Sequence, residues 1–207
     1  MERLIQSRKE RKASTRRNLI MSSQKLFAAK GYDGTTLEEI AEDAGLHVQT
    51  LYRHFANKAE LLNAGDEERL NTFRIAIRSR KQTDCTFKFW RNWVEDAIRQ
   101  FTPPTGRGNY REALMERKGP EPYSAVGVHY EDLLAESLCK DYPLADVGTG
   151  LSLTRLAAIS LRGVNTSVLR SYTKDCGFDL ITEAVAAVDS VEAIYRPLLE
   201  ATISRKF

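Results

Sequence analysis

Residues 47–58 hold side chains suited to hydrogen bonding with a nucleic acid. The amide of Gln49 can pair with adenine, and Arg53 can bond to guanine or to a phosphate oxygen. Val48 and the methyl group of Thr50 can touch a thymine methyl group. The residues suited to phosphate oxygens are Thr35, Thr36, Tyr52, His54 and Lys58. This part of the chain therefore offers both base contacts and backbone contacts, which a DNA reader requires.

Two of these candidates have structural alternatives that the sequence leaves open. The ring of Tyr52 could be half-buried, with only its hydroxyl exposed. His47 is a further candidate for DNA contact, but it could also begin a helix without touching a base.

Motifs for catalysis are missing from the sequence. It contains no glycine-rich phosphate loop, H-E-x-x-H pair, Cys-x-x-Cys pair or G-x-S-x-G elbow. Of the 3 histidines, only His129 lies outside the candidate DNA-contacting segment. We therefore expect no enzymatic activity and no metal or other cofactor.

The 3 cysteines are odd in number and widely spaced. Cys85, Cys139 and Cys176 form neither a disulfide framework nor a zinc pattern. We interpret them as reduced thiols that serve in packing.

The spacing of residues 35–55 predicts two short helices joined by a tight turn. Thr36 and Glu39 have the T-x-x-E spacing of a capping box at the first helix start. Gly45 can adopt the left-handed conformation that ends a helix. A second helix follows, and its side chains Leu51 and Phe55 face inward. The apolar face of the first helix is formed by Leu37, Ile40, Ala41 and Ala44. Together these features form a helix-turn-helix pattern.

The stretch LFAAKGYDGTTLEEIAEDAGLHVQTLYRHFANKAELL resembles the DNA-binding signature of the TetR family of bacterial transcriptional regulators. The resemblance covers residues 20–62. Family members usually have a small hydroxyl residue at the position of His47, and often a small residue at that of Gln49. These two departures concern the operator sequence and leave the motif intact.

The resemblance implies a dimer that reads a palindromic operator in double-stranded DNA. It also implies a helical pocket for a small-molecule effector in the rest of the chain. Neither the operator nor the effector follows from it.

The positive charge of the chain is concentrated near its beginning. The net charge is +3 overall, whereas residues 1–58 hold 11 Lys and Arg against 7 Asp and Glu. Residues 1–17 alone contain seven basic and two acidic side chains. This arm could be a solvated disordered tail, or it could bind DNA phosphates.

Apolar spacing at the helical period continues through the rest of the chain, and no alternating strand pattern occurs. The helices that we expect begin near residues 14, 57, 84, 110, 123, 151 and 180. The fold class is therefore all-α, with a basic arm and helix-turn-helix domain at 1–58 and a helical effector-binding and dimerisation domain at 59–207.

Aromatic and polar-tipped residues are concentrated in the second domain and could line a ligand pocket. The candidates are Phe87, Trp90, Trp93, Tyr110, Met115, Tyr123, His129 and Tyr130. Most of them could equally be ordinary core residues.

Two long apolar patterns near the end of the chain have more apolar positions than one buried stripe requires. We predict a two-fold, four-helix dimer contact there. Its residues would be Leu153, Ala157, Ser160, Val164, Ala184, Val188, Val191 and Tyr195. The alternative is that both helices form the core of a monomer.

The sequence thus predicts a cytoplasmic, dimeric repressor that a small molecule releases from its operator. It has neither a membrane-spanning apolar run nor a secretory signal. Two alternatives remain open: a constitutive DNA-binding or architectural factor without an effector, and a small-molecule-binding or enzymatic helical protein whose helix-turn-helix is vestigial.

Overall fold

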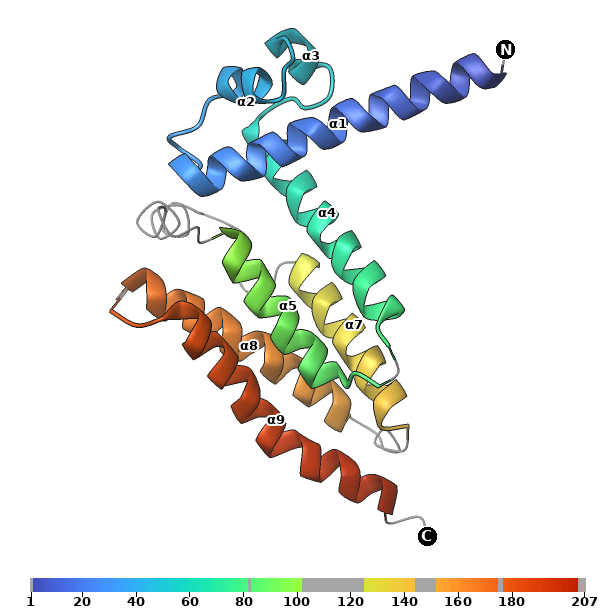
Figure 1. Ribbon diagram of the computed structural model, residues 1–207, viewed down its shortest axis with the longest axis vertical. Helices are drawn as coiled ribbons and strands as arrows, with labels where there is room; N and C mark the ends of the chain where they lie inside the picture. The colour runs from blue at the N-terminus through green and yellow to red at the C-terminus, as the bar shows by residue number, and fades with distance from the viewer. Residues whose placement is uncertain (1, 82, 102–124, 144–151, 175–176, 205–207) are drawn as a thin grey trace. The chain divides into compact units, whose positions relative to one another are not determined.

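The computed structural model describes residues 2–81, 83–101, 125–143, 152–174 and 177–204, and its ordered elements are all helices (Figure 1). The helices are α1 (Glu2–Lys30), α2 (Leu37–Asp43), α3 (Val48–Tyr52), α4 (Lys58–Ser79), α5 (Thr86–Phe101), α7 (Ala125–Asp141), α8 (Leu153–Lys174) and α9 (Leu180–Ser204). No strand occurs within these ranges, so the predicted all-α class is confirmed. The short helix expected near residue 110 lies outside the described residues.

The described residues form two compact units, which we treat separately. The first unit runs to Arg69 and the second begins at Leu70. The division therefore falls inside α4, whereas the sequence suggested a domain boundary after Lys58.

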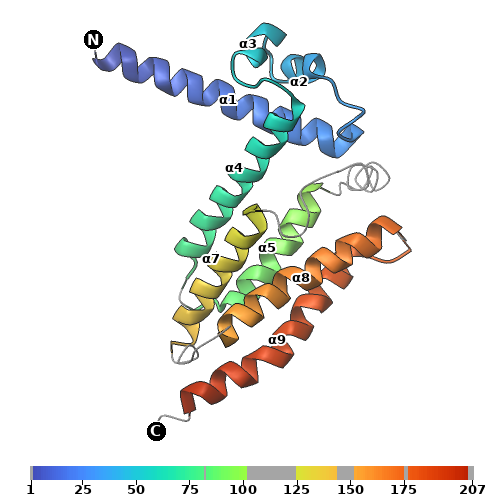
Figure 2. The ribbon, with the colours of Figure 1, turned by 180° about the vertical axis from the view of Figure 1, so that it is seen from behind.

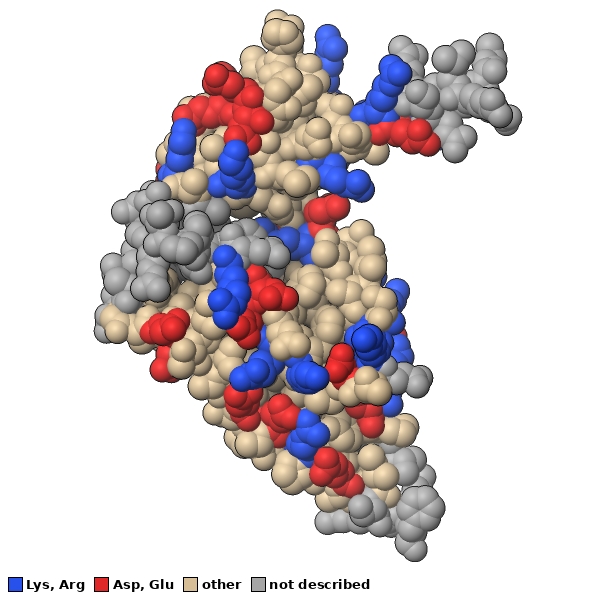
Figure 3. Space-filling view, in the orientation of Figure 1, with Lys and Arg blue, Asp and Glu red and all other residues tan. Residues whose placement is uncertain are grey.

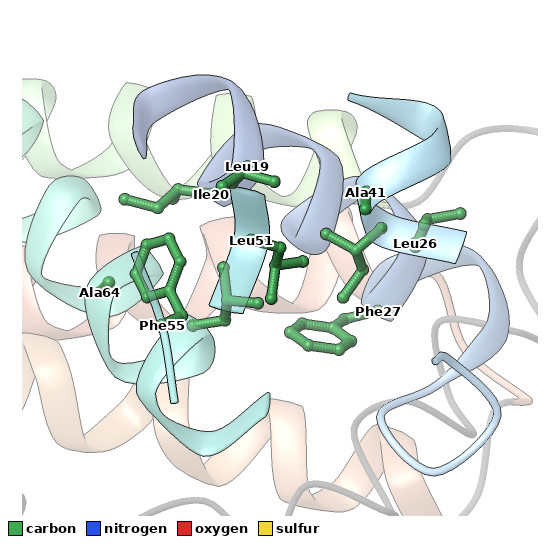
Figure 4. Close-up of a cluster of buried hydrophobic side chains, with 10 residues drawn as sticks. Leu19, Ile20, Leu26, Phe27, Ala41, Leu51, Phe55 and Ala64 are labelled. Carbon is green, nitrogen blue, oxygen red and sulfur yellow. The ribbon is translucent and has the colours of Figure 1, made fainter. Parts of the chain in front are cut away.

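The first unit has a hydrophobic core to which α1, α2, α3 and the start of α4 all contribute (Figure 4). The core residues are Leu19, Ile20, Leu26, Phe27, Ile40, Ala41, Leu51, Phe55, Leu61 and Ala64. Burying a large aliphatic or aromatic side chain contributes about 1.5–3 kcal/mol. The short helices α2 and α3 are thus held in place by this core and not by their own helix propensity.

Local hydrogen bonds fix the ends of the helices in the first unit. The Glu39 N–H donates to the Thr36 hydroxyl at 3.1 Å, and the Thr36 N–H donates to the Glu39 carboxylate at 3.0 Å. The predicted capping box is therefore present. Gly31 and Gly45 have φ values of 78° and 67°, the left-handed conformation in which a side chain is strained.

Helix α1 begins much earlier than the sequence suggested. It includes most of the basic arm, starting at Glu2, whereas we expected the first helix to begin near residue 14. The arm has no Gly or Pro to interrupt the helix.

The second unit is a layered set of helices in which α8 packs against both α7 and α9, and α5 packs against α9 and α7. Figures 1 and 2 show α8 and α9 side by side along much of their length. The buried apolar face of α5 includes Phe87, Trp90, Val94 and Ile98, which follow the helical period.

Two buried polar links join helices of the second unit that are far apart in sequence. Trp90 Nε1 donates to Asn165 Oδ1 at 2.9 Å, and Asn165 Nδ2 donates to the Ala184 carbonyl at 3.2 Å. These bonds connect α5, α8 and α9 and satisfy polar groups that would be costly to bury alone.

The second link is centred on Asp141 at the end of α7. Its carboxylate pairs with the guanidinium of Arg80 and accepts bonds from the Thr86 N–H at 2.7 Å and the Thr86 hydroxyl at 2.6 Å. Arg80 Nε also donates to the Ser137 hydroxyl at 2.9 Å. Asp141 therefore satisfies the start of α5, where the first N–H groups have no partner within the helix.

Candidate functional site

Helix α3 is anchored by side chains that point into the core of the first unit. Leu51 and Phe55 are 0% and 1% exposed. The turn before α3 is closed by the Leu46 N–H, which donates to the Ala41 carbonyl at 2.8 Å. Because the anchors are buried, the opposite face of α3 has a fixed orientation toward solvent.

The exposed face of α3 holds three of the predicted DNA-contacting residues. Gln49, Tyr52 and Arg53 are exposed, and their spacing of three and four places them on one side of the helix. Tyr52 is 51% exposed, so its ring is not buried in the core. An amide, a phenol and a guanidinium are thus presented together to solvent.

The residues between them have mixed roles. Val48 is partly buried and packs against the hydrophobic core, and Thr50 is also partly buried. His47 is exposed at the N-cap of α3, where its side chain makes no capping hydrogen bond. His47 is therefore available to a ligand, and Val48 serves packing as well.

Thr35 has a structural role that corrects its assignment to a phosphate. Its side chain is fully buried, and its hydroxyl donates to the Gly31 carbonyl at 2.7 Å and lies 3.3 Å from the Leu26 carbonyl. A group with no exposed surface cannot reach DNA. The adjacent Thr36 is exposed, and its hydroxyl keeps its O–H after accepting the capping bond.

Lys58 also holds the fold together at the start of α4. Its ammonium donates to the carbonyls of Tyr32 and Thr35 at 2.6 and 2.8 Å, and it lies 4.5 Å from the centroid of the Tyr32 ring. A lysine has three N–H donors. One donor therefore remains for the phosphate contact that we predicted.

His54 lies near two basic residues of α1. Partial burial lowers the pKa of His54, and the charges of Lys12 and Arg16 lower it further. Arg16 Nη1 donates to the His54 carbonyl at 3.3 Å, and its guanidinium lies 4.2 Å from the centroid of the Phe55 ring. Lys12 and Arg16 thus bring two positive charges close to His54, beside the end of α3.

Sequence reasoning assigned Lys12 and Arg16 only to a basic arm. The signal that could have placed them is their i, i+4 spacing, which puts them on one face of a helix. This inference requires α1 to begin before residue 14.

The acidic residues of α2 pair with the other end of α1. Lys25 pairs with Asp43, and Lys30 Nζ lies 2.7 Å from Glu39 Oε1. These lysines lower the pKa values of Asp43 and Glu39. Figure 3 shows the red carboxylates of α2 gathered beside blue side chains. The positive charge of α1 is thus neutralised at its C-terminal end by α2.

Several residues predicted to line a ligand pocket pack against one another around Phe73. The Phe73 ring centroid lies 5.6, 5.1 and 4.6 Å from those of Trp90, Trp93 and Tyr130, and 5.9 Å from that of Phe89. Such distances are typical of packed aromatic pairs. The sequence did not single out Phe73 or Phe89 as members of this set.

The other predicted pocket residues are not part of this aromatic cluster. Phe87 is fully buried, and Arg196 lies beside its ring. The His129 side chain is 56% exposed and lies 4.0 Å from Asp132. The side chains of Tyr110, Met115 and Tyr123 lie outside the described residues.

An open cavity of about 630 Å³ lies elsewhere in the second unit, at the end of α4, the start of α5 and the end of α7. None of the predicted pocket residues lines it. Its lining residues are Ile77, Arg78, Arg80, Thr83, Cys85, Leu133, Glu136, Ser137, Lys140, Asp141 and Tyr142.

Half of the residues predicted at the dimer contact are buried within the chain itself. Ala157, Ala184, Val188 and Val191 are between 0% and 4% exposed. Their assignment to a subunit contact is therefore corrected, since they pack α8 and α9 into their own unit. Leu153, Ser160, Val164 and Tyr195 are partly buried, and the Ser160 and Tyr195 hydroxyls lie 3.0 Å apart.

Apolar side chains on the outer faces of α8 and α9 are exposed instead. Leu156 and Ile159 on α8 are each 37% exposed, and Ile194 and Leu198 on α9 are 61% and 49% exposed. Gly163 lies one turn beyond Ile159, and a Cβ added there would meet nothing within 4 Å. The exposed apolar stripes are thus rotated from the predicted positions.

The described residues contain no cluster of three potential metal ligands. Among the helices that the structure describes, none is long and apolar enough to cross a membrane.

The chain is similar to known regulatory proteins in its first unit. Residues 19–64 match the family described as "Bacterial regulatory proteins, tetR family". The HTH-type transcriptional regulator TcmR of Streptomyces glaucescens is 49% identical over 47 residues, which cover 23% of this chain and 21% of TcmR. The matches to the first four such relatives span less than a third of each relative's length.

Solved structures resemble the whole fold. SmeT, the repressor of the Stenotrophomonas maltophilia multidrug efflux pump SmeDEF, aligns with a TM-score of 0.61 and 24% identity, covering 87% of this chain and 89% of SmeT. The regulator FadR from Bacillus subtilis in complex with stearoyl-CoA aligns with a TM-score of 0.58 and 17% identity, covering 84% and 96% of the two chains. At these identities the likeness establishes the fold.

Proposed function

We propose that this chain, whose residues 19–64 match the tetR family of bacterial regulatory proteins, is a dimeric transcriptional repressor released from its operator by a small molecule. The observation that carries this proposal is the exposed face of α3, where Gln49, Tyr52 and Arg53 are aligned above buried anchors. A rigidly held helix with such side chains fits the major groove. We expect such a regulator to be located in the cytoplasm.

Selection of bound fragments from genomic DNA tests the DNA-binding part of this proposal. We expect one palindromic consensus whose half-sites are about one helical turn, roughly 34 Å, apart. Gln49→Ala should relax one position in each half-site, at a cost of about 1–3 kcal/mol against the preferred site. Asn63→Ala, at an exposed position on α4, is the control and should give the wild-type consensus. An unchanged consensus for Gln49→Ala would show that Gln49 reads no base.

Dimer formation is supported by the outer faces of α8 and α9. Gly163 weakens the exposed interior of α8 by about 1 kcal/mol relative to alanine, and no residue that the structure describes lies within 4 Å of a Cβ added there. Close approach of a second helix would require the absence of a side chain at this position. Leu156, Ile159, Ile194 and Leu198 supply apolar surface around that point.

Sedimentation of three variants tests the dimer. Ile159→Glu combined with Ile194→Glu should give a folded monomer with poor operator affinity, since both side chains are exposed in the single chain. Gly163→Trp should also give a folded monomer with poor operator affinity, because its bulky side chain would block the close approach of a second helix. Ile75→Glu changes an equally exposed apolar residue on α4 and should leave the dimer intact. A wild-type monomer at micromolar concentration would contradict this contact.

Release by a small molecule is supported by the fold. FadR, which shares it, is seen in complex with stearoyl-CoA. In this chain the effector pocket would lie among α5, α7 and α8, near Trp93 and Tyr130. Addition of candidate apolar compounds should lower operator affinity and raise transcription from a reporter. Falling transcription in the presence of the regulator's ligand would indicate activation in place of repression.

A constitutive DNA-binding factor is the second candidate. It is favoured by the packing of Trp90, Trp93 and Tyr130 against Phe73, which gives these aromatic side chains a structural role in the core. Operator affinity that no compound alters, with the dimer and consensus intact, would support it.

A further inference from the structure

The cavity at the ends of α4, α5 and α7 contains a thiol. Cys85 is half-buried and lines this cavity of about 630 Å³, so a small molecule can reach its sulfur from solvent. Its carbonyl accepts a bond from the Phe89 N–H at 3.0 Å, which places Cys85 just before the first turn of α5. The positive end of the α5 dipole is therefore directed toward the residue.

A guanidinium on α9 contacts the sulfur of Cys85. Arg196 Nη2, on α9, donates to Cys85 Sγ at 3.2 Å, across 111 residues of sequence. Glu192 fixes the guanidinium through its bond to Arg196 Nε at 2.9 Å, and the Phe87 ring lies beside it at 6.0 Å. A held cation that donates to sulfur stabilises negative charge on that atom.

A tyrosine hydroxyl in the same cavity has no hydrogen-bond partner among the described residues. Tyr142 is only 6% exposed and lines the cavity with Cys85. Burial raises the pKa of Tyr142, so its phenol keeps its proton and can donate a hydrogen bond. Buried hydroxyls are rarely left unpaired, because the loss costs about 1–3 kcal/mol. A guest with an acceptor oxygen would satisfy it.

We propose that Cys85 is a covalent modification site for small α,β-unsaturated carbonyl compounds that enter this cavity. The Cys85 sulfur attacks the β-carbon and forms a C–S bond. The π bond between the α- and β-carbons breaks, and its electron pair forms a double bond between the α-carbon and the carbonyl carbon. The π pair of the carbonyl group moves to its oxygen, which gives an enolate. Tyr142 donates a hydrogen bond to that oxygen, and Arg196 holds the sulfur.

The addition balances without a further reactant. The proton that the thiol releases to water is matched by one that the α-carbon takes from water as the enolate collapses. The product is a thioether in which the cavity holds the added carbonyl compound.

Cys139 provides a control within the same chain. It is also half-buried and lies on α7, where its sulfur is 3.4 Å from the neutral hydroxyl of Thr154. It does not line the cavity. Reactivity set by exposure alone would be similar for both thiols, whereas reactivity set by the cavity would favour Cys85.

The test is timed labelling of the folded full chain with N-ethylmaleimide, followed by peptide mass spectrometry that reads each cysteine separately. We expect Cys85 to react at least about tenfold faster than Cys139, since the thiolate is the nucleophile. Arg196→Gln should slow labelling of Cys85 and leave that of Cys139 unchanged. Arg196→Lys, which keeps a cation, should restore part of the rate. Arg91→Gln removes an exposed arginine elsewhere on the unit and is the matched control.

Tyr142→Phe distinguishes the effect of the Tyr142 hydroxyl from the effect of the reagent's access to the Cys85 sulfur. It should slow the reaction of Cys85 with N-ethylmaleimide but not with iodoacetamide, because displacement of iodide places no charge on a carbonyl oxygen. Equal labelling of Cys85 and Cys139 in the wild type would overturn the proposal. So would a Cys85 rate that is the same in the wild type and in folded Arg196→Gln.

Discussion

The polar bonds that fix helices inside each of the two units span different distances along the sequence. In the first unit the start of α2 is fixed by local bonds, the capping box of Thr36 and Glu39, which are three residues apart. The bond from Lys58 to the Tyr32 carbonyl in the same unit is remote, since it spans 26 residues. In the second unit the corresponding bonds are remote, such as that from Thr86 to Asp141 across 55 residues and that from Trp90 to Asn165 across 75. Local bonds leave a motif in the sequence, whereas remote bonds leave none.

The difference also separates the functional surfaces. The first unit presents Gln49, Tyr52 and Arg53 to solvent because their neighbours are anchored. In the second unit three of the eight predicted pocket residues are packed together around Phe73, and the described cavity is lined mostly by charged and polar residues. The types of residues in a helix therefore indicate a binding site only where it is already known which face of that helix is exposed.

Among the substitutions that test this contrast, Asp141→Asn should have the largest effect on stability. Asp141 pairs with Arg80, whose side chain is only 9% exposed, and removal of one charge leaves the other buried without its partner. We expect a loss of about 3–5 kcal/mol in the free energy of unfolding of the second unit. Asp189→Asn breaks the exposed pair with Arg91 and should cost less than about 1 kcal/mol. Urea denaturation followed by tryptophan fluorescence measures both, since Trp90 and Trp93 lie in this unit. Equal costs would remove the contrast between buried and exposed links.

An intermediate effect is expected for Lys58→Met in the first unit. The change removes two bonds from a charged donor to the carbonyls of Tyr32 and Thr35, which we expect to cost about 1.5–3 kcal/mol. Hydrogen exchange of the amides in α3 reports this loss.

A second measurement on Lys58→Met separates the two roles of the residue. If Lys58 also binds a phosphate, the slope of log affinity against log salt should become shallower by about 0.9. Loss of stability with an unchanged salt slope would leave Lys58 a purely structural role.

A smaller effect is expected for Thr36→Ala, which removes the side-chain half of the capping box. The cost should be about 1 kcal/mol, since the core still holds α2. Thr36→Ser keeps the hydroxyl and is the control. A melting temperature that is the same for Thr36→Ala and the wild type would show that the core alone determines where α2 begins.

The smallest effect should be the pH dependence that His54 gives to DNA binding. Its pKa is lowered in the free protein, chiefly by burial, so the imidazole is neutral near pH 7. A DNA phosphate nearby would favour the charged form, and DNA binding would then take up a proton. Operator affinity should therefore rise as pH falls below 7, by less than about tenfold per pH unit because one proton is involved.

His54→Gln should flatten this pH profile in a fluorescence anisotropy titration at constant salt. A profile that is the same for both proteins would place the His54 imidazole away from the phosphates.

The same lowered pKa acts in the opposite direction on the stability of the free first unit. The unfolded state binds the proton more readily than the folded state does, so stability falls as pH drops below the ordinary histidine value of about 6.5. DNA should offset this loss.

The sequence by itself determined the all-α class, the helix-turn-helix and the capping box. These depend on residues within a few positions of one another, where Thr36, Glu39 and Gly45 act through local backbone geometry. It also identified Gln49, Tyr52 and Arg53 as candidates for DNA contact, because their side chains suit bases or phosphates, but it left open whether the Tyr52 ring is half-buried.

Only the tertiary structure decided which apolar stripe of α8 and α9 faces inward. Both helices are apolar on more than one side, so periodicity could not separate buried Val188 from exposed Ile194. The same holds for Lys58 and Cys85, whose partners are carbonyls or a guanidinium brought from other segments by the fold. A side chain's role depends on what lies within about 4 Å of it, and in a folded chain most of those neighbours are remote in sequence.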